Sequence, residues 1–555
     1  MSWESLPLEL YEHIFKNLNF WDRKPLSLVC RRWNQVVFSR SLCRQLCIEL
    51  SRGDWGPSGD KEQVVLVDEA VVKESERDYR VAYVKWCTDS GPEVLRSISR
   101  LLRKLEGKCL LEGLIIDAPL GQMMSDFLHT HGELLTRIRK LQVSTETIDN
   151  RLLMERCVLK MGQLETLFWR EVSSHDFLQN ESPLIVIEAP KLHSAVVKFG
   201  DSDSGRGAVW HNSVMELRDS ACLKALKVHL HQRMWNRFFE QKLETLEHLT
   251  IAHKTQDLRS RDWNAVFCNM PNLKSIQMWE ANDAILEAIN RHCRKLRVLL
   301  LENADIIGFL LEDRHFPLLE HLRLETAKIQ SNKTLHLPIL KHLEWFNVVN
   351  QNNQTLILAA PMLRSIRQSR NGASDFTLSC KPPLEKLQLD LYASDIPGHF
   401  FQPFPNMQEL SIRVSSARPD LDRMIPYFRS IKEFTLIAYN APLQCDQMLN
   451  EIFKNCNDVK AMTLCGFNPN LELSFPVFAQ IFRNRNLKSL KMFGLTITGK
   501  SFPLQLPPEL ETFELRHVKV MDVAFGAYVF SPDEPHRVIC IKSENCCSYS
   551  SKDCD

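Results

Sequence analysis

A short apolar pattern recurs at regular intervals along most of this 555-residue sequence. Four segments, beginning at Leu296, Leu319, Leu384 and Leu487, have the form Leu-x-x-Leu-x-Leu or end in Met instead of the last Leu. Accepting other apolar residues extends the series to seventeen segments, which begin at Leu111, Ile138, Leu164, Leu192, Leu223, Leu246, Leu273, Leu296, Leu319, Leu340, Leu363, Leu384, Met407, Ile431, Val459, Leu487 and Leu510. Their mean spacing is about 25 residues, which is typical of stacked repeats. Ala195 and Gln368 break the pattern in the segments that begin at Leu192 and Leu363.

This period predicts a leucine-rich-repeat solenoid, in which each repeat contributes one short parallel strand and stacking buries leucines that a single repeat could not bury. Several copies follow a proline, as in Met-Pro-Asn-Leu at 270–273. Long spacings contain helical patterns, for example at 283–290 and 447–453, whereas the residues around Thr334 and Thr355 alternate with period two. We therefore expect helices on the convex side at both ends of the repeat region and extended segments near its middle.

The first fifty residues carry a different pattern. Leu6, Leu10, Ile14 and Leu18 recur every four residues, and the two aromatic residues Tyr11 and Phe15 widen this apolar stripe. After a plausible N-cap at Asp22, the residues Leu26, Val29, Cys30 and Trp33 repeat at helical steps. Two or three short helices result, with apolar residues on more than one face. Such a unit either caps the downstream domain or docks another protein.

The residues themselves resemble a known motif. Leu-Pro-x-Glu-Leu at 6–10, Ile-Phe-x-x-Leu at 14–18 and Leu-Ser-Leu-Val-Cys-Arg-Arg-Trp at 26–33 together resemble the F-box. The resemblance implies an all-α three-helix domain whose apolar face inserts into the adaptor subunit of a cullin–RING ubiquitin ligase. Pro25 departs from the family pattern and leaves the start of the second helix open. By the resemblance, the adaptor contacts are Leu6, Pro7, Leu10, Ile14, Leu18, Val29, Cys30 and Trp33.

The predicted fold class is therefore α/β: a leucine-rich-repeat solenoid preceded by a small F-box domain. We expect the F-box-like domain at 1–45, a linker and helical entry region at 46–110, about seventeen irregular repeats at 111–520 and a C-terminal tail at 521–555. Within the entry region, Val94 to Leu105 has the pattern of an amphipathic helix.

The resemblance to F-box proteins with leucine-rich repeats implies the substrate-recognition subunit of an SCF-type ubiquitin ligase. Such a protein is a non-catalytic receptor in the cytoplasm, the nucleus or both. Its partners would be the adaptor, the cullin and a protein substrate. Two alternatives remain open: a repeat scaffold in which the F-box-like segment is only an end cap, and an enzymatic or small-ligand function on the concave face.

Side chains between the leucines of each repeat strand point away from the core, because successive side chains alternate between the two faces of a strand. Aromatic residues mixed with arginine are common at protein-binding hot spots. The candidate substrate-binding residues selected on this basis are Phe168, Arg170, Trp279, Arg323, Phe346 and Arg367.

Composition argues against several other classes of function. The 69 Lys and Arg residues nearly balance the 68 Asp and Glu residues, so no overall field favours nucleic acid or an anionic membrane. No stretch of about 18 apolar residues could span a bilayer. Phosphate-binding loops, a nucleophile elbow and paired Cys-x-x-Cys motifs are absent from the 555 residues. We therefore expect no cofactor, no metal site, no nucleic-acid partner and no membrane association.

Overall fold

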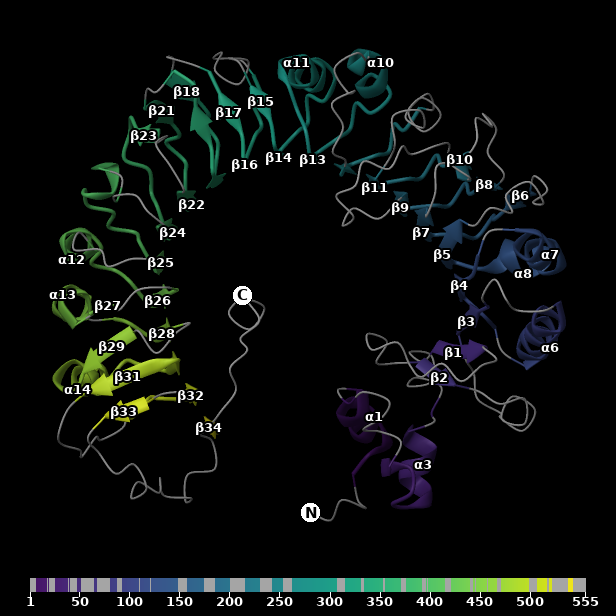
Figure 1. The fold of residues 1–555 in the computed structure, drawn as a ribbon, viewed down its shortest axis with the longest axis horizontal. Coiled ribbons are helices and arrows are strands. Elements are labelled where there is room, and N and C mark those ends of the chain that lie inside the picture. The colour runs from purple at the N-terminus through teal and green to yellow at the C-terminus, as the bar shows by residue number, and fades with distance from the viewer. Residues whose placement is uncertain are drawn as a thin grey trace. The chain divides into compact units, whose positions relative to one another are not determined.

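The computed structural model describes residues 6–16, 18, 25–37, 39, 47–50, 64–66, 80–86, 92–108, 110–119, 121–147, 157–173, 185–199, 215–229, 242–252, 262–306, 315–330, 334–352, 355–370, 376–391, 396, 398–414, 421–439, 443–444, 446–456, 458–466, 471–498, 507–516, 519–521 and 538–542 (Figure 1). The chain divides into two compact units, Met1–Gln277 and Met278–Asp555, and each is described by itself.

The N-terminal unit begins with the helices α1 (Leu8–Lys16) and α3 (Arg31–Val37). Pro7 lies just before α1, and its carbonyl accepts the backbone N–H groups of Leu10 and Tyr11 at 3.2 and 3.4 Å. The helical pattern predicted from Leu26 to Trp33 is interrupted, because residues 27–29 form a turn and α3 begins only at Arg31. The predicted N-cap at Asp22 lies outside the described residues.

The rest of the N-terminal unit is a ladder of parallel strands. Its strands are β1 (Cys47–Leu50), β2 (Val64–Leu66), β3 (Val81–Lys85), β4 (Gly113–Asp117), β5 (Lys140–Thr147), β7 (Thr166–Ser173), β9 (Ser194–Phe199), β11 (Ala225–His229) and β12 (His248–Ile251), and β13 (Ser275–Met278) lies at the boundary of the unit. From β4 to β12, the pairing of each strand with its neighbour begins two residues after the first apolar residue of a predicted segment.

The C-terminal unit continues the same arrangement within itself. Its strands are β14 (Val298–Glu302), β16 (His321–Glu325), β19 (His342–Phe346), β22 (Ser365–Arg370), β24 (Lys386–Leu391), β25 (Glu409–Val414), β26 (Glu433–Ala438), β28 (Ala461–Gly466), β30 (Ser489–Phe493), β32 (Thr512–Arg516) and β34 (Val538–Lys542). All of these neighbours pair in parallel. All seventeen predicted segments of the chain therefore contain a strand, and the fold is a leucine-rich-repeat solenoid.

The opposite side of the repeats carries both helices and strands. The predicted helices are present as α6 (Pro92–Lys108), α11 (Asp283–His292) and α13 (Asp446–Asn455). Other helices on this side include α7 (Gln122–Thr130), α8 (Gly132–Arg137), α10 (Trp263–Phe267), α12 (Leu421–Met424) and α14 (Phe475–Arg483).

The predicted extended segments near the middle are β18 (Thr334–His336) and β21 (Leu356–Ala359), which pair with each other, and β21 also pairs with β23 (Phe376–Leu378). A second small sheet of this unit contains β15 (Asp305–Ile306), β17 (Lys328–Ile329) and β20 (Val349–Asn350).

Two further sets of convex strands were not predicted. They are β6 (Cys157–Lys160), β8 (Ile185–Glu188) and β10 (Met215–Arg218) in the N-terminal unit, and β27 (Leu443–Gln444), β29 (Leu471–Ser474), β31 (Leu495–Thr498) and β33 (Lys519–Met521) in the C-terminal unit. In β6 the side chains of Cys157 and Leu159 are buried while those of Val158 and Lys160 are exposed, which is the alternation of a strand packed on one face. The expected helices are present on the convex side at both ends, and these strands lie there as well, which was not predicted.

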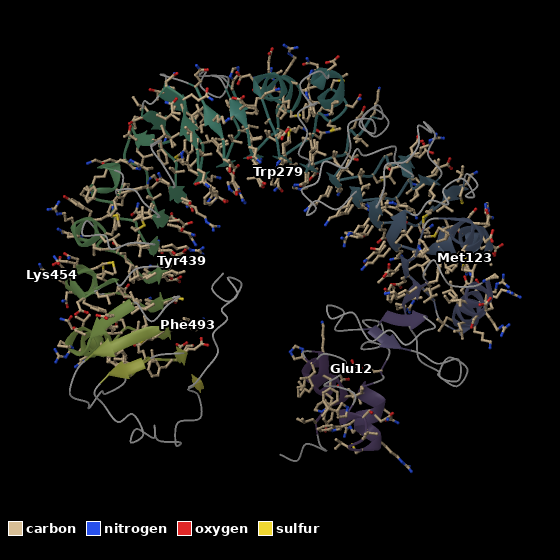
Figure 2. The ribbon with its side chains drawn as sticks, in the orientation of Figure 1. Glu12, Met123, Trp279, Tyr439, Lys454 and Phe493 are labelled. Atoms are coloured by element: carbon tan, nitrogen blue, oxygen red, sulfur yellow. The ribbon has the colours of Figure 1, made fainter. Side chains whose placement is uncertain are left out.

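The core lies between the strand ladder and the convex segments. In β16, Leu322 and Leu324 are fully buried, and the stack of such leucines provides the apolar area that stabilises the fold. Ala195 and Gln368 occupy the same inward position as these leucines and keep the register, although both depart from the sequence pattern. Figure 2 shows Trp279, Tyr439 and Phe493 on the strand side of the C-terminal unit and Lys454 of α13 on its outer side.

The predicted limits of the repeat region are too narrow. β1 and β3 already pair in the ladder upstream of residue 111, within the segment predicted as a linker. β34 pairs with β32 beyond residue 520, within the predicted tail. None of these three strands was predicted as a repeat strand, because none of them lies in a segment that keeps the leucine spacing.

Candidate functional site

The helical segment at the N-terminus forms its own small core. Tyr11 and Phe15 of α1 and Val36 and Val37 of α3 are buried together. Trp33 packs against this cluster, with its ring 6.1 Å from that of Tyr11 and 5.4 Å from that of Phe15, both in edge-on geometry. The helices are thus held together by aromatic residues on the inner side of α1.

Other apolar residues of the segment point away from this core. On α1, Leu10 is 48% exposed and Ile14 is 38% exposed, and in the turn before α3 Val29 is 62% exposed. Pro7 and Cys30 are exposed as well. These five predicted adaptor contacts are therefore accessible, and the local core forms without them.

The three remaining predicted contacts, Leu6, Leu18 and Trp33, are partly buried against the local core. Their first role is to hold the helices together. Sequence reasoning missed two exposed apolar residues, Leu8 at 44% and Leu28 at 86%. Their signal was present, since Leu8 lies between Pro7 and Glu9 and Leu28 lies within the stretch at 26–33 that was quoted for the motif.

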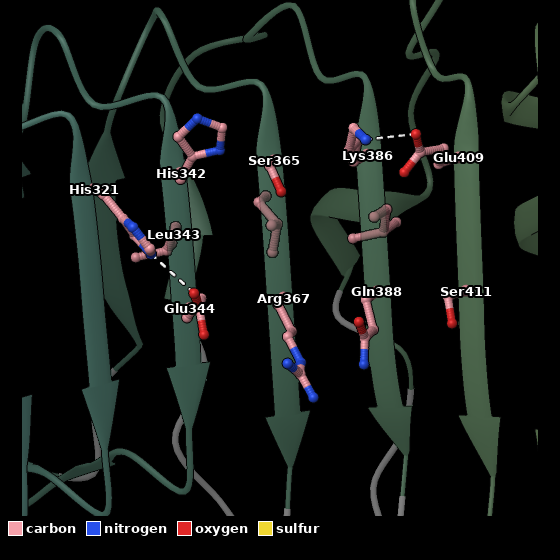
Figure 3. A pocket seen from close by; sticks show the side chains of 12 residues that line it. His321, His342, Leu343, Glu344, Ser365, Arg367, Lys386, Gln388, Glu409 and Ser411 are labelled. Atoms are coloured by element: carbon pink, nitrogen blue, oxygen red, sulfur yellow. Dashed lines mark hydrogen bonds and ion pairs between the residues drawn. The ribbon is translucent and has the colours of Figure 1, made fainter. Parts of the chain in front are cut away.

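A second candidate surface lies on the strand side of the C-terminal unit, across β16, β19, β22, β24 and β25 (Figure 3). A shallow pocket of about 230 Å³ lies there among the side chains between the buried leucines. The in-register ladder places Glu344, Arg367, Gln388 and Ser411 in one row across four strands. A neighbouring row contains Glu325, Phe346 and Ser369.

Three of the predicted substrate-binding residues come together at this surface. Arg323 on β16 and Arg367 on β22 flank Phe346 on β19, with their guanidinium carbons 5.4 and 5.1 Å from the centre of its ring. The expectation that Phe346 is exposed is wrong: only 9% of its surface is accessible. It lies on the predicted face, but the two guanidinium groups cover it through cation–π contacts.

Ion pairs connect the strands around the pocket. His321 Nε2 lies 2.9 Å from Glu344 Oε1, and Arg323 pairs with both Glu325 and Glu344. The hydrogen bond from His321 lowers the pKa of Glu344, so this carboxylate stays ionised. Lys386 donates to Glu409, and this hydrogen bond raises the pKa of Lys386.

The pKa of His342 is lowered by burial and by the neighbouring His321 and Lys341. Its imidazole therefore stays neutral around pH 7 and adds no positive charge to the pocket. The rings of His321 and His342 lie 5.8 Å apart on adjacent strands.

The other predicted substrate-binding residues lie elsewhere. Phe168 and Arg170 are on β7 in the N-terminal unit, where Lys198 of the next strand lies 5.7 Å from the centre of the Phe168 ring. Trp279 follows β13 directly and is half-buried. These three residues therefore do not belong to the cluster of Arg323, Phe346 and Arg367.

The described ranges contain neither a metal site nor a membrane-spanning helix. Among these residues there is no group of three or more His, Cys, Asp or Glu side chains that could hold a metal ion. None of the helices in the described part of the chain is both long and apolar enough to cross a membrane.

Residues 3–49 match the family model of the F-box-like domain. The chain therefore carries an F-box-like domain followed by leucine-rich repeats. The match covers α1, α3 and the exposed residues Leu10, Ile14 and Val29, so the accessible apolar surface belongs to the F-box-like domain. No curated protein matches the chain.

Among solved structures, an internalin from Listeria monocytogenes is similar at 11% identity and a TM-score of 0.26, covering 78% of this chain and 93% of its own. A leucine-rich-repeat protein from Leptospira interrogans is similar at 12% identity and a TM-score of 0.23, covering 79% of this chain and 95% of its own. Because both TM-scores are low, the fold assignment rests on the ladder of parallel strands.

Proposed function

We propose that this protein is the substrate-recognition subunit of an SCF-type cullin–RING ubiquitin ligase. In this proposal the F-box-like domain binds the ligase adaptor, and the leucine-rich repeats bind a protein substrate. The receptor is not catalytic itself. It contributes proximity, because holding the substrate near the ubiquitin-loaded enzyme turns a chance encounter into an event at high effective concentration. Such a role places the protein in the cytoplasm, the nucleus or both.

The observation that carries the proposal is that the apolar side chains of α1 fall into two sets, one buried and one exposed. Tyr11 and Phe15 build the local core, whereas Leu10 and Ile14, which were assigned to the adaptor by the F-box resemblance, remain exposed. An exposed apolar residue that the local core does not use is available to a partner.

The alternative is a repeat scaffold in which the F-box-like domain only caps the solenoid. The two functions differ in what Ile14 does. In a receptor, Ile14 contacts the adaptor and a charge at this position leaves folding intact. In an end cap, Ile14 packs against the repeats and a charge at this position lowers stability.

The test is co-expression of the full chain with an adaptor subunit, followed by co-purification and thermal unfolding. We expect Ile14→Asp to abolish adaptor binding with an unchanged unfolding midpoint, because a buried carboxylate at an apolar interface is strongly unfavourable. The matched control is Ile357→Asp, since Ile357 on β21 is 41% exposed, close to the 38% of Ile14. This control should retain the adaptor.

A third variant calibrates the stability readout. Phe15 is 2% exposed, so Phe15→Ala should cost the F-box-like domain about 3 to 5 kcal/mol and lose both its fold and the adaptor. If Ile14→Asp behaved like Phe15→Ala, or if the wild-type chain bound no adaptor, the end-cap alternative would be correct.

A further inference from the structure

The strongest unexplained feature outside the F-box-like domain is the Arg367 side chain. Its guanidinium lies 5.1 Å from the centre of the Phe346 ring, and its Nε is buried without a hydrogen-bond partner. Among the described residues no ion pair or hydrogen bond satisfies this side chain, whereas Figure 3 shows His321 joined to Glu344 and Lys386 joined to Glu409. The ring holds the guanidinium in place on one side, and the terminal nitrogens remain available to a ligand in the pocket.

A comparison with the other cations on these strands shows that Arg367 differs from them. Arg323 pairs with Glu325, Lys386 pairs with Glu409, and Arg413 lies 3.7 Å from Asp390. Each of these three positive charges therefore has a carboxylate partner within the protein. Within the described residues, Arg367 is the cation of this surface that forms no ion pair, and the ionised Glu344 on the neighbouring strand interacts with it only through its charge.

Three of the residues around Arg367 are neutral and polar, and the fourth, Glu344, is the ionised residue opposite it on β19. Ser365 lies two residues earlier on the same face of β22, and Gln388 and Ser411 follow in the same row on the next two strands. Hydroxyl and amide groups can donate hydrogen bonds to an anion already held by an arginine. The pocket volume of about 230 Å³ suits one side chain and not a folded element.

The charges decide which anion fits. A guanidinium binds a carboxylate or a phosphate through two parallel hydrogen bonds. A phosphate carries nearly two negative charges at neutral pH, but Arg367 offers a single positive charge, which the ionised Glu344 beside it already offsets in part. A monovalent carboxylate therefore balances this site better than a phosphate does.

We propose that Arg367 is a specificity-determining residue that binds the side-chain carboxylate of an acidic peptide segment in the protein substrate. Ser365, Gln388 and Ser411 complete the pocket around this carboxylate, and Phe346 positions the guanidinium from beneath. The proposal rests on the proposed function insofar as the peptide belongs to a ligase substrate.

The test uses the purified full chain and pools of immobilised peptides with degenerate flanks, each pool having Glu, Gln, phosphoserine or Lys at the central position. We expect the wild type to retain the Glu pool at least about tenfold better than the Gln pool, since a charged hydrogen bond is lost with Gln. Arg367→Gln should remove this preference, and Arg367→Lys should weaken it because a lysine cannot form the bidentate contact.

The matched control is Arg364→Gln, which removes the same charge three residues earlier. Arg364 is paired with Glu385 at 3.3 Å and does not line the pocket, so this variant should keep the wild-type preference. Unfolding midpoints of all variants establish that each one is folded.

Several results would overturn the proposal: no retention of any pool, equal retention of the Glu and Gln pools, an unchanged preference in folded Arg367→Gln, or stronger retention of the phosphoserine pool than of the Glu pool. Adaptor binding is scored separately. The chain could show a Glu preference that depends on Arg367 and still bind no adaptor. That result would contradict the proposed ligase function and support the peptide site.

Discussion

Gln368 is a polar residue at a position that the fold otherwise gives to leucine. It is 2% exposed on β22, and its Oε1 is buried without a hydrogen-bond partner among the described residues. A buried amide oxygen without a partner costs about 1 to 3 kcal/mol. We therefore expect Gln368→Leu to raise the free energy of unfolding by about 1 to 2 kcal/mol, measured as a higher midpoint in urea. A lower midpoint would mean that the amide has a partner that Leu cannot replace.

The neighbouring strands β19 and β22 illustrate what could be predicted residue by residue. The alternation of β22 placed Arg367 on the open face correctly. The exposure of Phe346 was predicted wrongly, because the cover over its ring comes from Arg323 and Arg367 on the two neighbouring strands. A sequence pattern within one strand contains no information about which long side chains of adjacent repeats will fold over it.

At the scale of elements, His131 is the single residue between the helices α7 and α8, and it is 2% exposed. Burial, and to a lesser extent the positive charge of Arg103, lowers the pKa of His131 to about 4. In the unfolded chain its pKa would be near 6.5. Above that pH the residue is neutral in both states, and as the pH falls from 6.5 towards 4 only the unfolded chain binds the proton.

The stability of this region should therefore decrease by up to about 3 kcal/mol as the pH falls through that window. We expect the thermal midpoint of the wild type to drop more between pH 7 and pH 5 than that of His131→Leu, in which no proton can bind at this position. If the thermal midpoints of the two proteins fell equally with pH, the prediction would be contradicted. His131 would then either stay neutral in the unfolded chain as well or be accessible to a proton in the folded one.

The elements differ in how well they could be predicted. Helices such as α6 and α11 were evident because their apolar residues recur at helical spacing over several turns. The strands β6, β8 and β10 were missed although each has four residues, as many as the predicted β21; in β8 three successive residues, Ile185 to Ile187, are buried, so no period-two pattern is present. Their pairing with one another, which joins residues about thirty positions apart, is what shows that they form a sheet.

At the scale of the whole molecule, a solenoid transmits instability only between neighbouring repeats, because each repeat contacts only the next ones. Gly494 offers a test. It follows β30 with a φ of 59°, and a Cβ at this position would lie 1.9 Å from the carbonyl oxygen of Gly466. Gly494→Ala should therefore destabilise this region by about 3 kcal/mol or more.

We expect the effect to remain local. Amide hydrogen exchange should accelerate in β28, β30 and β32 of Gly494→Ala, while β16 and β19 of the same unit and β5 and β7 of the N-terminal unit keep their wild-type protection. Faster exchange along the entire chain would contradict nearest-neighbour coupling and indicate that the protein unfolds as a single cooperative unit.

The repeat period, the parallel strands and the F-box resemblance could all be derived from the order of residues, because each depends on a pattern that is local in the chain. Pattern-breaking strands such as β3, the cover over Phe346 and the absence of an ion pair to Arg367 among the described residues could not. These features depend on contacts between residues about twenty or more positions apart, and the tertiary structure alone decides which side chains of adjacent repeats meet.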